Sequence, residues 1–308
     1  MINWLTRTQK TSLSWSVLCL IGISIWANPA LAGDPFRRSN PRPIGDKTEA
    51  AFIAIFRKGN YTEAQKYLLE ATKVEGDEPL AHAMQSSLAY SDGNFDQMKA
   101  AADNTLATAQ KLVSKDPLRG NLYVAVGLFL QGAYTYKTQG PLGAIDKLQK
   151  VFDHLELAEQ NAPNDPEFNL LKGYLDLILS VNLPFSKPED AIARFEKYAA
   201  PDYMVDRALS SAYRDLKQYD KALDFMNKAL VISPDNPELQ YLKGQILRKQ
   251  GKNNKNMVLL KEAYTYFEQA MKKVDQLPKE VQIPLRHDHQ AVQQEIEKLA
   301  ANPTLDKF

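Results

Sequence analysis

Apolar and polar residues follow a helical period along most of the chain. From Asp46 onward, apolar residues recur every three or four positions, whereas Val, Ile and Thr never gather into the alternating runs that are typical of strands. Glycine, proline and asparagine interrupt the pattern at helix-sized intervals. The chain is therefore expected to be all-α, with consecutive helices arranged as antiparallel pairs.

The interruptions divide the chain into six candidate helix pairs and one final helix. The main breakers are Gly59-Asn60, Gly93-Asn94, Asp116-Pro117, Gly140-Pro141, the Pro163 to Pro166 and Pro184 to Pro188 segments, Pro201, the Pro234 to Pro237 segment, Gly251, Pro278 and Pro284. The expected pairs occupy residues 46–78, 79–115, 117–161, 166–200, 203–236 and 237–276. Residues 279–301 predict an amphipathic helix that caps the last pair.

Two fragments of the sequence recur at long spacing. Gly-Asn followed by an aromatic residue begins at Gly59 and again at Gly93, a period of about 34 residues. The pattern P-E-x-x-x-L-K-G begins at Pro166 and returns at Pro237, which is about two such periods further on. A repeat of this length indicates stacked helical units that bury a shared core.

Residues 203–236 resemble the tetratricopeptide repeat (TPR), a helix–turn–helix unit of about 34 residues. The residues that carry the resemblance are Leu209, Ser210 and Tyr213 in the first helix and Tyr219, Ala222, Met226, Ala229 and Pro234 in and after the second. Asp206, Lys217 and Met226 depart from the family's usual residues. The resemblance extends more loosely over residues 46–301. It implies a right-handed TPR-like α-solenoid of about five to six helix pairs plus a C-terminal capping helix.

Residues 1–32 have the composition of a secretory signal peptide. Arg7 and Lys10 precede an apolar stretch at 13–27, and Ala30-Leu31-Ala32 supplies small residues for cleavage after Ala32. The apolar stretch is about 15 residues long, short of the roughly 20 that span a bilayer. We therefore expect export to the periplasm or the thylakoid lumen, with no stable membrane insertion after cleavage. An export signal joined to degenerate repeats resembles secreted bacterial TPR proteins, possibly cyanobacterial ones.

Residues 33–45 and 302–308 flank the repeats. The sequence of 33–45, GDPFRRSNPRPIG, is rich in proline and arginine, and its prolines oppose helix formation. We expect an extended leader exposed to solvent. The alternative is that Arg37, Arg38 and Arg42 contact an acidic partner. Residues 302–308 are expected to form a tail.

Composition excludes several functional classes. Lys and Arg number 38 and Asp and Glu number 37, a balance that argues against nucleic-acid binding. The single cysteine, Cys19, lies in the predicted signal peptide, so the mature chain has no disulfide. His287 and His289 are two positions apart and point in different directions on a helix, so no metal site is expected. We find no catalytic motif and expect a protein without enzymatic activity or cofactors.

The resemblance also suggests a binding surface. TPR proteins usually bind ligands on a concave face, through positions 2, 5, 9 and 12 of each unit's first helix. Those positions include Arg207 and Arg214 in unit 203–236, Tyr241, Gln245 and Arg248 in unit 237–276, and Tyr174 in unit 166–200. Arginine and tyrosine are favoured at interfaces, and arginine binds carboxylates in a bidentate manner. The three arginines are expected to form a basic stripe beside the two tyrosines.

Three functions are compatible with this pattern. The first is an exported scaffold that binds a peptide or protein partner on the concave face during assembly or maintenance of an envelope or membrane complex. The second is a periplasmic module for a glycan or small ligand, which solvent-facing Tyr174 and Tyr241 beside a closed pocket would favour. The third is a hydrolase, which requires clustered carboxylates with shifted pKa values in a cleft. An aromatic binding face at Tyr123, Phe129, Tyr134 and Tyr136 is an alternative to packing of those side chains between helices.

Overall fold

The computed structural model describes residues 33–37, 39–182 and 188–301. The predicted signal peptide, Arg38 and the predicted tail lie outside these residues. The helices are α1 (Asp46–Phe52), a π-helical turn η1 (Ile53–Arg57), α2 (Tyr61–Val74), α3 (Pro79–Ser91), α4 (Phe95–Leu112), α5 (Pro117–Gln139), α6 (Leu142–Asn161), α7 (Pro166–Asn182), α8 (Pro188–Lys197), α9 (Asp202–Asp215), α10 (Tyr219–Ile232), α11 (Pro237–Asn253), α12 (Met257–Met271), a 3-10 turn η2 (Val274–Gln276) and α13 (Lys279–Ala301).

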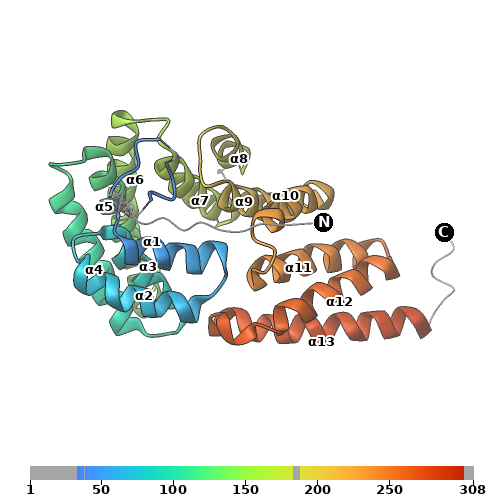
Figure 1. The fold of residues 1–308 in the computed structure, drawn as a ribbon. Coiled ribbons are helices and arrows are strands. Elements are labelled where there is room, and N and C mark those ends of the chain that lie inside the picture. The colour runs from blue at the N-terminus through green and yellow to red at the C-terminus, as the bar shows by residue number, and fades with distance from the viewer. Residues whose placement is uncertain (1–32, 38, 183–187, 302–308) are drawn as a thin grey trace, which may run out of the picture. The chain divides into compact units, whose positions relative to one another are not determined.

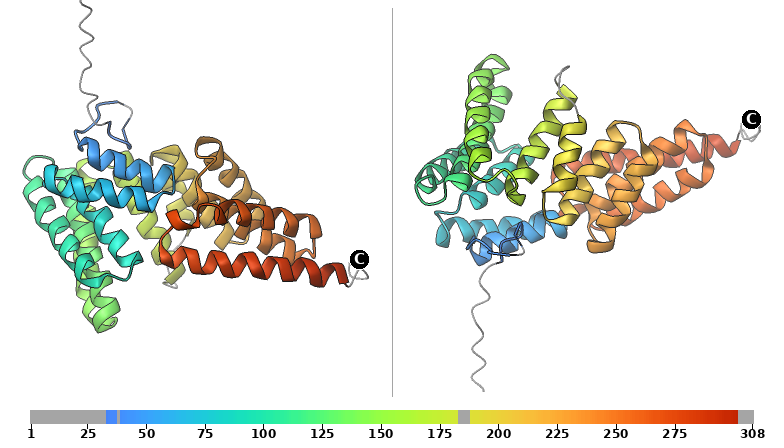
Figure 2. Two further views of the ribbon diagram at one scale, coloured as in Figure 1. Left: turned by 60° about the horizontal axis from the view of Figure 1, so that its bottom comes forward. Right: turned by 90° about the horizontal axis from the view of Figure 1, so that it is seen from above.

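The helices form a stack of pairs, as the sequence predicted. The first pair joins α1 and η1 to α2, and the next five are α3–α4, α5–α6, α7–α8, α9–α10 and α11–α12 (Figures 1 and 2). Helix α13 lies along α12 as the expected capping helix. No β-strand occurs in the part of the chain that the structure describes. The prediction of an all-α TPR-like fold is confirmed.

The recurring Gly-Asn dipeptide makes the turn within the first two pairs. Gly59 and Gly93 adopt φ angles of 65° and 72°, a left-handed conformation that costs glycine little. The Asn60 and Asn94 side chains then accept hydrogen bonds from backbone N–H groups three positions later, at 3.0 and 3.1 Å. These bonds cap the second helix of each pair. The regular spacing of the motif therefore reflects a repeated turn.

Small residues let the two helices of a pair approach closely. Ala222 and Ala229 of α10 are fully buried, and so is Met226, which lies between them on the same face of the helix. The glycine of the recurring P-E-x-x-x-L-K-G pattern has a similar role, since a Cβ atom on Gly244 would lie 2.4 Å from the Phe267 ring of the partner helix. Larger side chains at these positions would clash with the partner helix, so only small residues fit there.

Two residues that often interrupt helices, Pro284 and Gly251, lie inside helices here. Pro284 lies inside α13, although it cannot donate a backbone hydrogen bond there. Leu285 and Val292, on the buried face of the same helix, are fully buried, and their packing offsets the lost hydrogen bond. Gly251 lies inside α11, which continues to Asn253, so the break between α11 and α12 falls a few residues later than Gly251.

The first helix pairs also contact the last ones. The Tyr61 hydroxyl donates to Glu238 of α11 at 2.8 Å, and Thr62 donates to the Asp275 carbonyl at 3.1 Å. Asn236 donates to the Arg57 carbonyl at 3.2 Å, beside Gly59. These contacts join residues that are far apart in the sequence. The first helices of the six pairs are η1 (with α1), α3, α5, α7, α9 and α11, and we call the face that they line the first-helix face. No helix of the described segments is long and apolar enough to cross a membrane.

Candidate binding groove

Two adjoining cavities open on the first-helix face. One, of about 190 Å³, lies among α3, α5, α6 and α7, and the other, of about 270 Å³, lies among η1, α2, α3, α5 and α7. Ser87, Val126 and Leu171 line both, so the cavities form one continuous groove, which we call the apolar groove. Further lining residues include Ile55, Phe56, Met84, Ala125, Phe129, Leu130, Val151, Leu155, Tyr174, Leu175 and Ile178.

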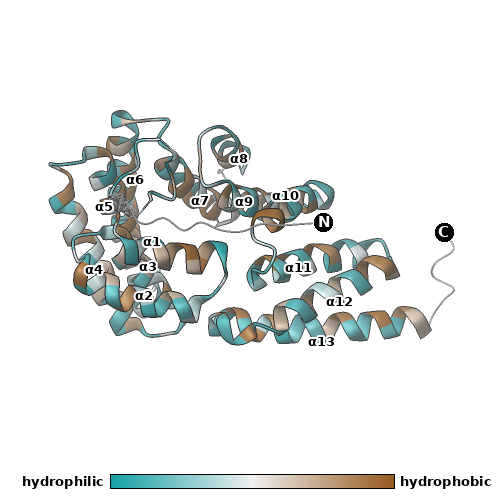
Figure 3. Cartoon of the chain, in the orientation of Figure 1, coloured by the Kyte–Doolittle hydropathy of each residue, from teal (hydrophilic) through white to brown (hydrophobic). Residues whose placement is uncertain are grey.

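The groove exists because α5 and α7 carry more apolar residues than their neighbours cover. Apolar residues run along both helices (Figure 3). One side of α5 lies so close to α4 that a Cβ on Gly127 would be 2.9 Å from the Leu106 backbone. The opposite side presents Val126 and Phe129, which are only half-buried. A helix that is apolar on several sides needs more than one partner surface.

The groove offers apolar contact and little else. Among the described residues, no charged side chain lines it. Its five hydroxyl groups all donate within the chain: Ser87 to the Ala83 carbonyl at 3.0 Å, Ser91 to Glu280 at 2.6 Å, Tyr61 to Glu238 at 2.8 Å, Tyr123 to Glu167 at 2.7 Å and Tyr174 to the Met204 carbonyl at 3.1 Å. A ligand in this groove is therefore bound mainly through apolar surface.

Of the six residues that the sequence assigned to binding, Tyr174 lines this groove and the other five are not among its lining residues. Arg207 forms an ion pair with Glu238, whose other oxygen accepts from Tyr61. Burial lowers the pKa of the Arg207 guanidinium, but Glu238 together with Tyr61 and Tyr174 outweighs that effect, and the net pKa is raised. Tyr174 is half-buried, its ring packs edge-on against Phe195 at 5.4 Å, and burial raises the pKa of its hydroxyl.

The other assigned residues bond to their neighbours in the stack. Arg214 donates to Asp215 at 2.9 Å and to Gln245 at 3.1 Å. Arg248 donates to Asp288 of α13 at 2.6 Å and to Glu295 at 3.0 and 2.9 Å. The Tyr241 hydroxyl donates to Asp288 at 2.8 Å, and only 7% of Tyr241 is exposed.

These contacts correct the expected basic stripe. Carboxylates of α11 and α13 neutralise Arg207 and Arg248, because adjacent helices bring opposite charges together. The tyrosines do not face solvent either, since packing and hydrogen bonds hold both. Assignment of the six residues to partner binding stays a prediction. The sequence did not single out the apolar groove, apart from Tyr174 and Phe129, because its lining looks like ordinary core.

The leader is docked on the repeats, so the expectation that it is exposed to solvent is wrong. Phe36 is 3% exposed and its ring contacts Phe52 edge-on at 5.0 Å, and Ile44 is 1% exposed. The backbone is non-helical, as its prolines predict. Asp34 organises the segment by accepting from the backbone N–H groups of Phe36 at 2.9 Å and Arg42 at 3.1 Å.

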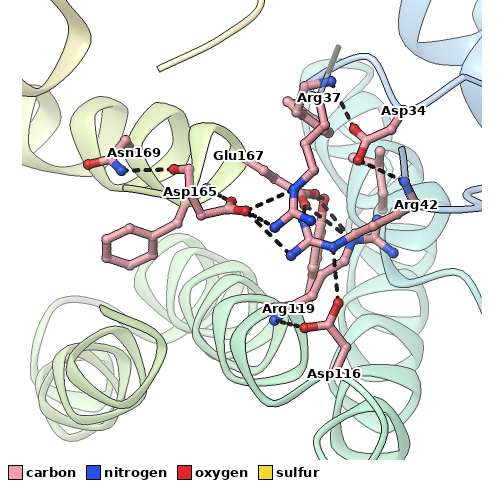
Figure 4. Close-up of polar contacts among 12 residues, drawn as sticks. Asp34, Arg37, Arg42, Asp116, Arg119, Asp165, Glu167 and Asn169 are labelled. Carbon is pink, nitrogen blue, oxygen red and sulfur yellow. Dashed lines mark hydrogen bonds and ion pairs between the residues drawn. The ribbon is translucent and has the colours of Figure 1, made fainter. Parts of the chain in front are cut away.

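Arginines of the leader bind carboxylates at the starts of the first helices (Figure 4). Arg37 and Arg42 both contact Asp165, the N-cap residue of α7. Arg42 also donates to Asp116, which caps α5, at 3.0 Å, and to Glu167 at 3.0 Å. Arg37 and Arg42 therefore contact acidic groups of their own chain, whereas Arg38 lies outside the described residues.

Arg119 joins three repeats beneath the leader. Its guanidinium donates to both oxygens of Glu78 at 2.8 and 2.6 Å and to Glu167 at 3.2 Å. Burial raises the pKa of the Glu167 carboxyl, and the Arg119 and Arg42 charges oppose that rise. We call the set Arg37, Arg42, Glu78, Asp116, Arg119, Asp165 and Glu167 the leader clasp. The arginines and carboxylates of the leader clasp are paired with one another. This pairing indicates that they hold the leader and the helices together.

Some of the remaining candidate side chains pack within the fold and others are exposed. His289 stacks on Tyr264 at 4.7 Å, whereas His287 is exposed. Among the residues described, no group of three or more His, Cys, Asp or Glu side chains is placed to hold a metal ion. Tyr123 is buried, and Tyr136 at the end of α5 is 57% exposed.

Comparison with known proteins identifies one repeat directly. Residues 211–251, from the second half of α9 through most of α11, match the family model described as "TPR repeat". This segment is therefore similar to a tetratricopeptide repeat. No curated protein matches the sequence. Solved structures similar to this chain include the human IFIT1 dimer with m7Gppp-AAAA, at 18% identity and a TM-score of 0.45, covering 82% of this chain and 58% of that one. The human IFIT1 dimer with PPP-AAAA is similar at 18% identity and a TM-score of 0.44, covering 82% and 66%.

Proposed function

We propose that this protein is a non-enzymatic TPR scaffold that binds apolar side chains of a protein partner in the apolar groove. One observation carries the proposal: within the described part of the chain, the groove is lined by apolar side chains, carries no charge, and has all its hydroxyl groups engaged. TPR units typically act in protein interaction. A leucine or phenylalanine side chain buried in such a groove contributes about 1.5–3 kcal/mol to binding.

Two other ligand classes fit the first-helix face less well. Glycan recognition relies on exposed aromatic faces and free hydrogen-bonding groups, whereas Tyr241 is 7% exposed and the hydroxyl of the half-buried Tyr174 donates to the Met204 carbonyl. An acidic peptide or a nucleic acid needs unpaired cations, whereas Arg207 and Arg248 are paired with carboxylates. The proposed partner is therefore a protein segment with apolar anchors.

The proposed setting follows from residues 1–32. Their composition is that of a secretory signal, so we place the mature protein in the periplasm or the thylakoid lumen. There the scaffold would hold an apolar segment of an envelope or membrane protein during assembly or maintenance of a complex. Such segments are exposed before assembly and buried after it.

Substitution of Ser87 by tryptophan tests the groove. Ser87 borders both cavities, is exposed, and its hydroxyl bonds only to its own helix, so a bulky side chain there fills the groove at little cost to the fold. Peptides are first selected from a random phage-displayed library against residues 33–308. We expect them to be rich in Leu, Phe and Trp and to bind Ser87→Trp at least about tenfold more weakly, as measured by calorimetry.

Ser114→Trp is the matched control, because Ser114 is also exposed and lies outside the groove, between α4 and α5. It should bind the peptides like the unmodified protein. Selection of acidic peptides whose affinity Ser87→Trp leaves unchanged would contradict the proposal. So would a protein that selects no peptide but binds palmitate in a manner that Ser87→Trp abolishes, since the groove would then be a lipid site.

A further inference from the structure

Gly33, the residue that follows the predicted cleavage site, makes a specific contact. Its backbone nitrogen donates to the Glu49 carboxylate at 2.8 Å. Glu49 lies in the first turn of α1 and is half-buried. The contact ties the start of the leader to the first helix of the stack, 16 positions away in the sequence. The other end of the leader is held by Ile44 and the leader clasp.

Glu49 is half-buried and has two acidic neighbours, Asp46 and Asp34. Burial is the main cause that raises the pKa of the Glu49 carboxyl; the Gly33 hydrogen bond opposes the rise, and the charges of Asp46 and Asp34 add to it. On the neighbouring helix α9, the Glu49 charge also contributes to the raised pKa of Tyr203. A backbone amide supplies one hydrogen and no charge to this acidic site. An ammonium group would supply three hydrogens and a full positive charge.

We propose that Glu49 is the docking site for the N-terminal ammonium group of the mature protein. A signal peptidase would hydrolyse the Ala32–Gly33 peptide bond with one water molecule. Ala32 then carries the new carboxylate and Gly33 the new amino group, which takes up the proton that the carboxylic acid releases. The Gly33 nitrogen already lies at hydrogen-bond distance from Glu49, so cleavage replaces the neutral amide donor by a charged ammonium group and forms an ion pair.

Glycine suits the first position of such a mature chain. A Cβ atom on Gly33 would lie 3.1 Å from a Glu49 oxygen, closer than most side chains allow. The ion pair would bind the leader at its first residue, while Phe36, Arg42 and Ile44 bind it farther along. Processing and leader docking are thereby coupled. The inference concerns maturation and is independent of the ligand in the apolar groove.

The first part of the test determines the mature N-terminus. The full chain is expressed in a bacterium with a general secretory pathway, and the exported protein is analysed by mass spectrometry. We expect a mass that begins at Gly33. A protein that keeps residues 1–32, or that begins at another position, would overturn the proposal.

The second part measures the pKa of the Gly33 amino group in that protein. Glycine is labelled with ¹³C, and the Gly33 Cα resonance is followed against pH by NMR. We expect a pKa about one unit above the ordinary 7.7–8.0 of an α-amino group. Glu49→Gln should return it to the ordinary range. The control Glu189→Gln, which removes an exposed carboxylate from the first turn of α8, should leave it raised.

The sign of the effect on stability follows from the same shift. An amino group whose pKa is raised by folding stabilises the folded chain below its unfolded pKa, and the contribution is lost as the pH rises through the folded value. A Gly33 amino group that titrates at the ordinary value, or whose raised pKa survives Glu49→Gln, would show that Glu49 does not bind it.

Discussion

Replacement of Arg119 by methionine is expected to lower the free energy of unfolding by about 3–5 kcal/mol at pH 7. Arg119 is 4% exposed and is the bidentate partner of Glu78. Its loss leaves Glu78 without the guanidinium and leaves Glu167, which is fully buried, with Arg42 as its remaining cation. An uncompensated buried carboxylate is costly, because protein surroundings solvate it less well than water. Urea unfolding followed by circular dichroism measures the loss.

The pH dependence of this loss distinguishes a buried charge from simple loss of packing. Burial already raises the pKa of Glu167, and removal of Arg119 raises it further. The folded variant then binds protons more readily than the unfolded chain, so its deficit should shrink as the pH falls from 7 towards 5. The control Arg286→Met, at an exposed position of α13, should change the stability by less than about 0.5 kcal/mol. A deficit for Arg119→Met below about 1 kcal/mol, or one independent of pH, would contradict the assigned role of the leader clasp.

Replacement of Phe36 by alanine is expected to cost about 3–5 kcal/mol of stability. Phe36 lies in the leader, only 3% of it is exposed, and it contacts the Phe52 ring of α1. A solvated leader would make the same substitution nearly neutral, so the experiment separates the two interpretations of residues 33–45. The reference is Phe95→Ala, because Phe95 is 37% exposed and should cost less. Equal, small losses for both variants would show that the leader is not docked in solution.

The helix pairs were predictable because the signals that define them are local. Gly59 and Gly93 mark the turns, and the small residues Ala222 and Ala229 mark close contact within a pair. Each pair of helices is formed by residues fewer than about 45 positions apart, and stacked repeats mainly contact their neighbours. The capping helix at residues 279–301 was predictable for the same reason, because its amphipathic pattern is local. That helix contains Pro284, and the packing of Leu285 outweighs the local preference of proline against helix.

The groove and the leader clasp depend on contacts that no local pattern contains. Arg37 contacts Asp165, and Tyr61 contacts Glu238, although each pair is far apart in the sequence. The sequence contains 38 basic and 37 acidic side chains, and nothing in their order tells which of them are paired. Arg207 therefore looked like a free cation on the binding face. Val126 and Leu171 looked like core residues, because exposure of an apolar side chain depends on how neighbouring helices are arranged.

The position of a bound peptide shows directly whether the apolar groove is the binding site. Residues 33–308 are prepared with ¹³C-methyl labels on Ile, Leu and Val and titrated with an apolar peptide recovered from the library, and methyl NMR follows each resonance. The account predicts the largest shifts at Val126, Leu171 and Ile178, which line the apolar groove on α5 and α7. Unchanged resonances of Val126, Leu171 and Ile178 in the presence of bound peptide would show that the ligand lies outside the apolar groove and contradict the account.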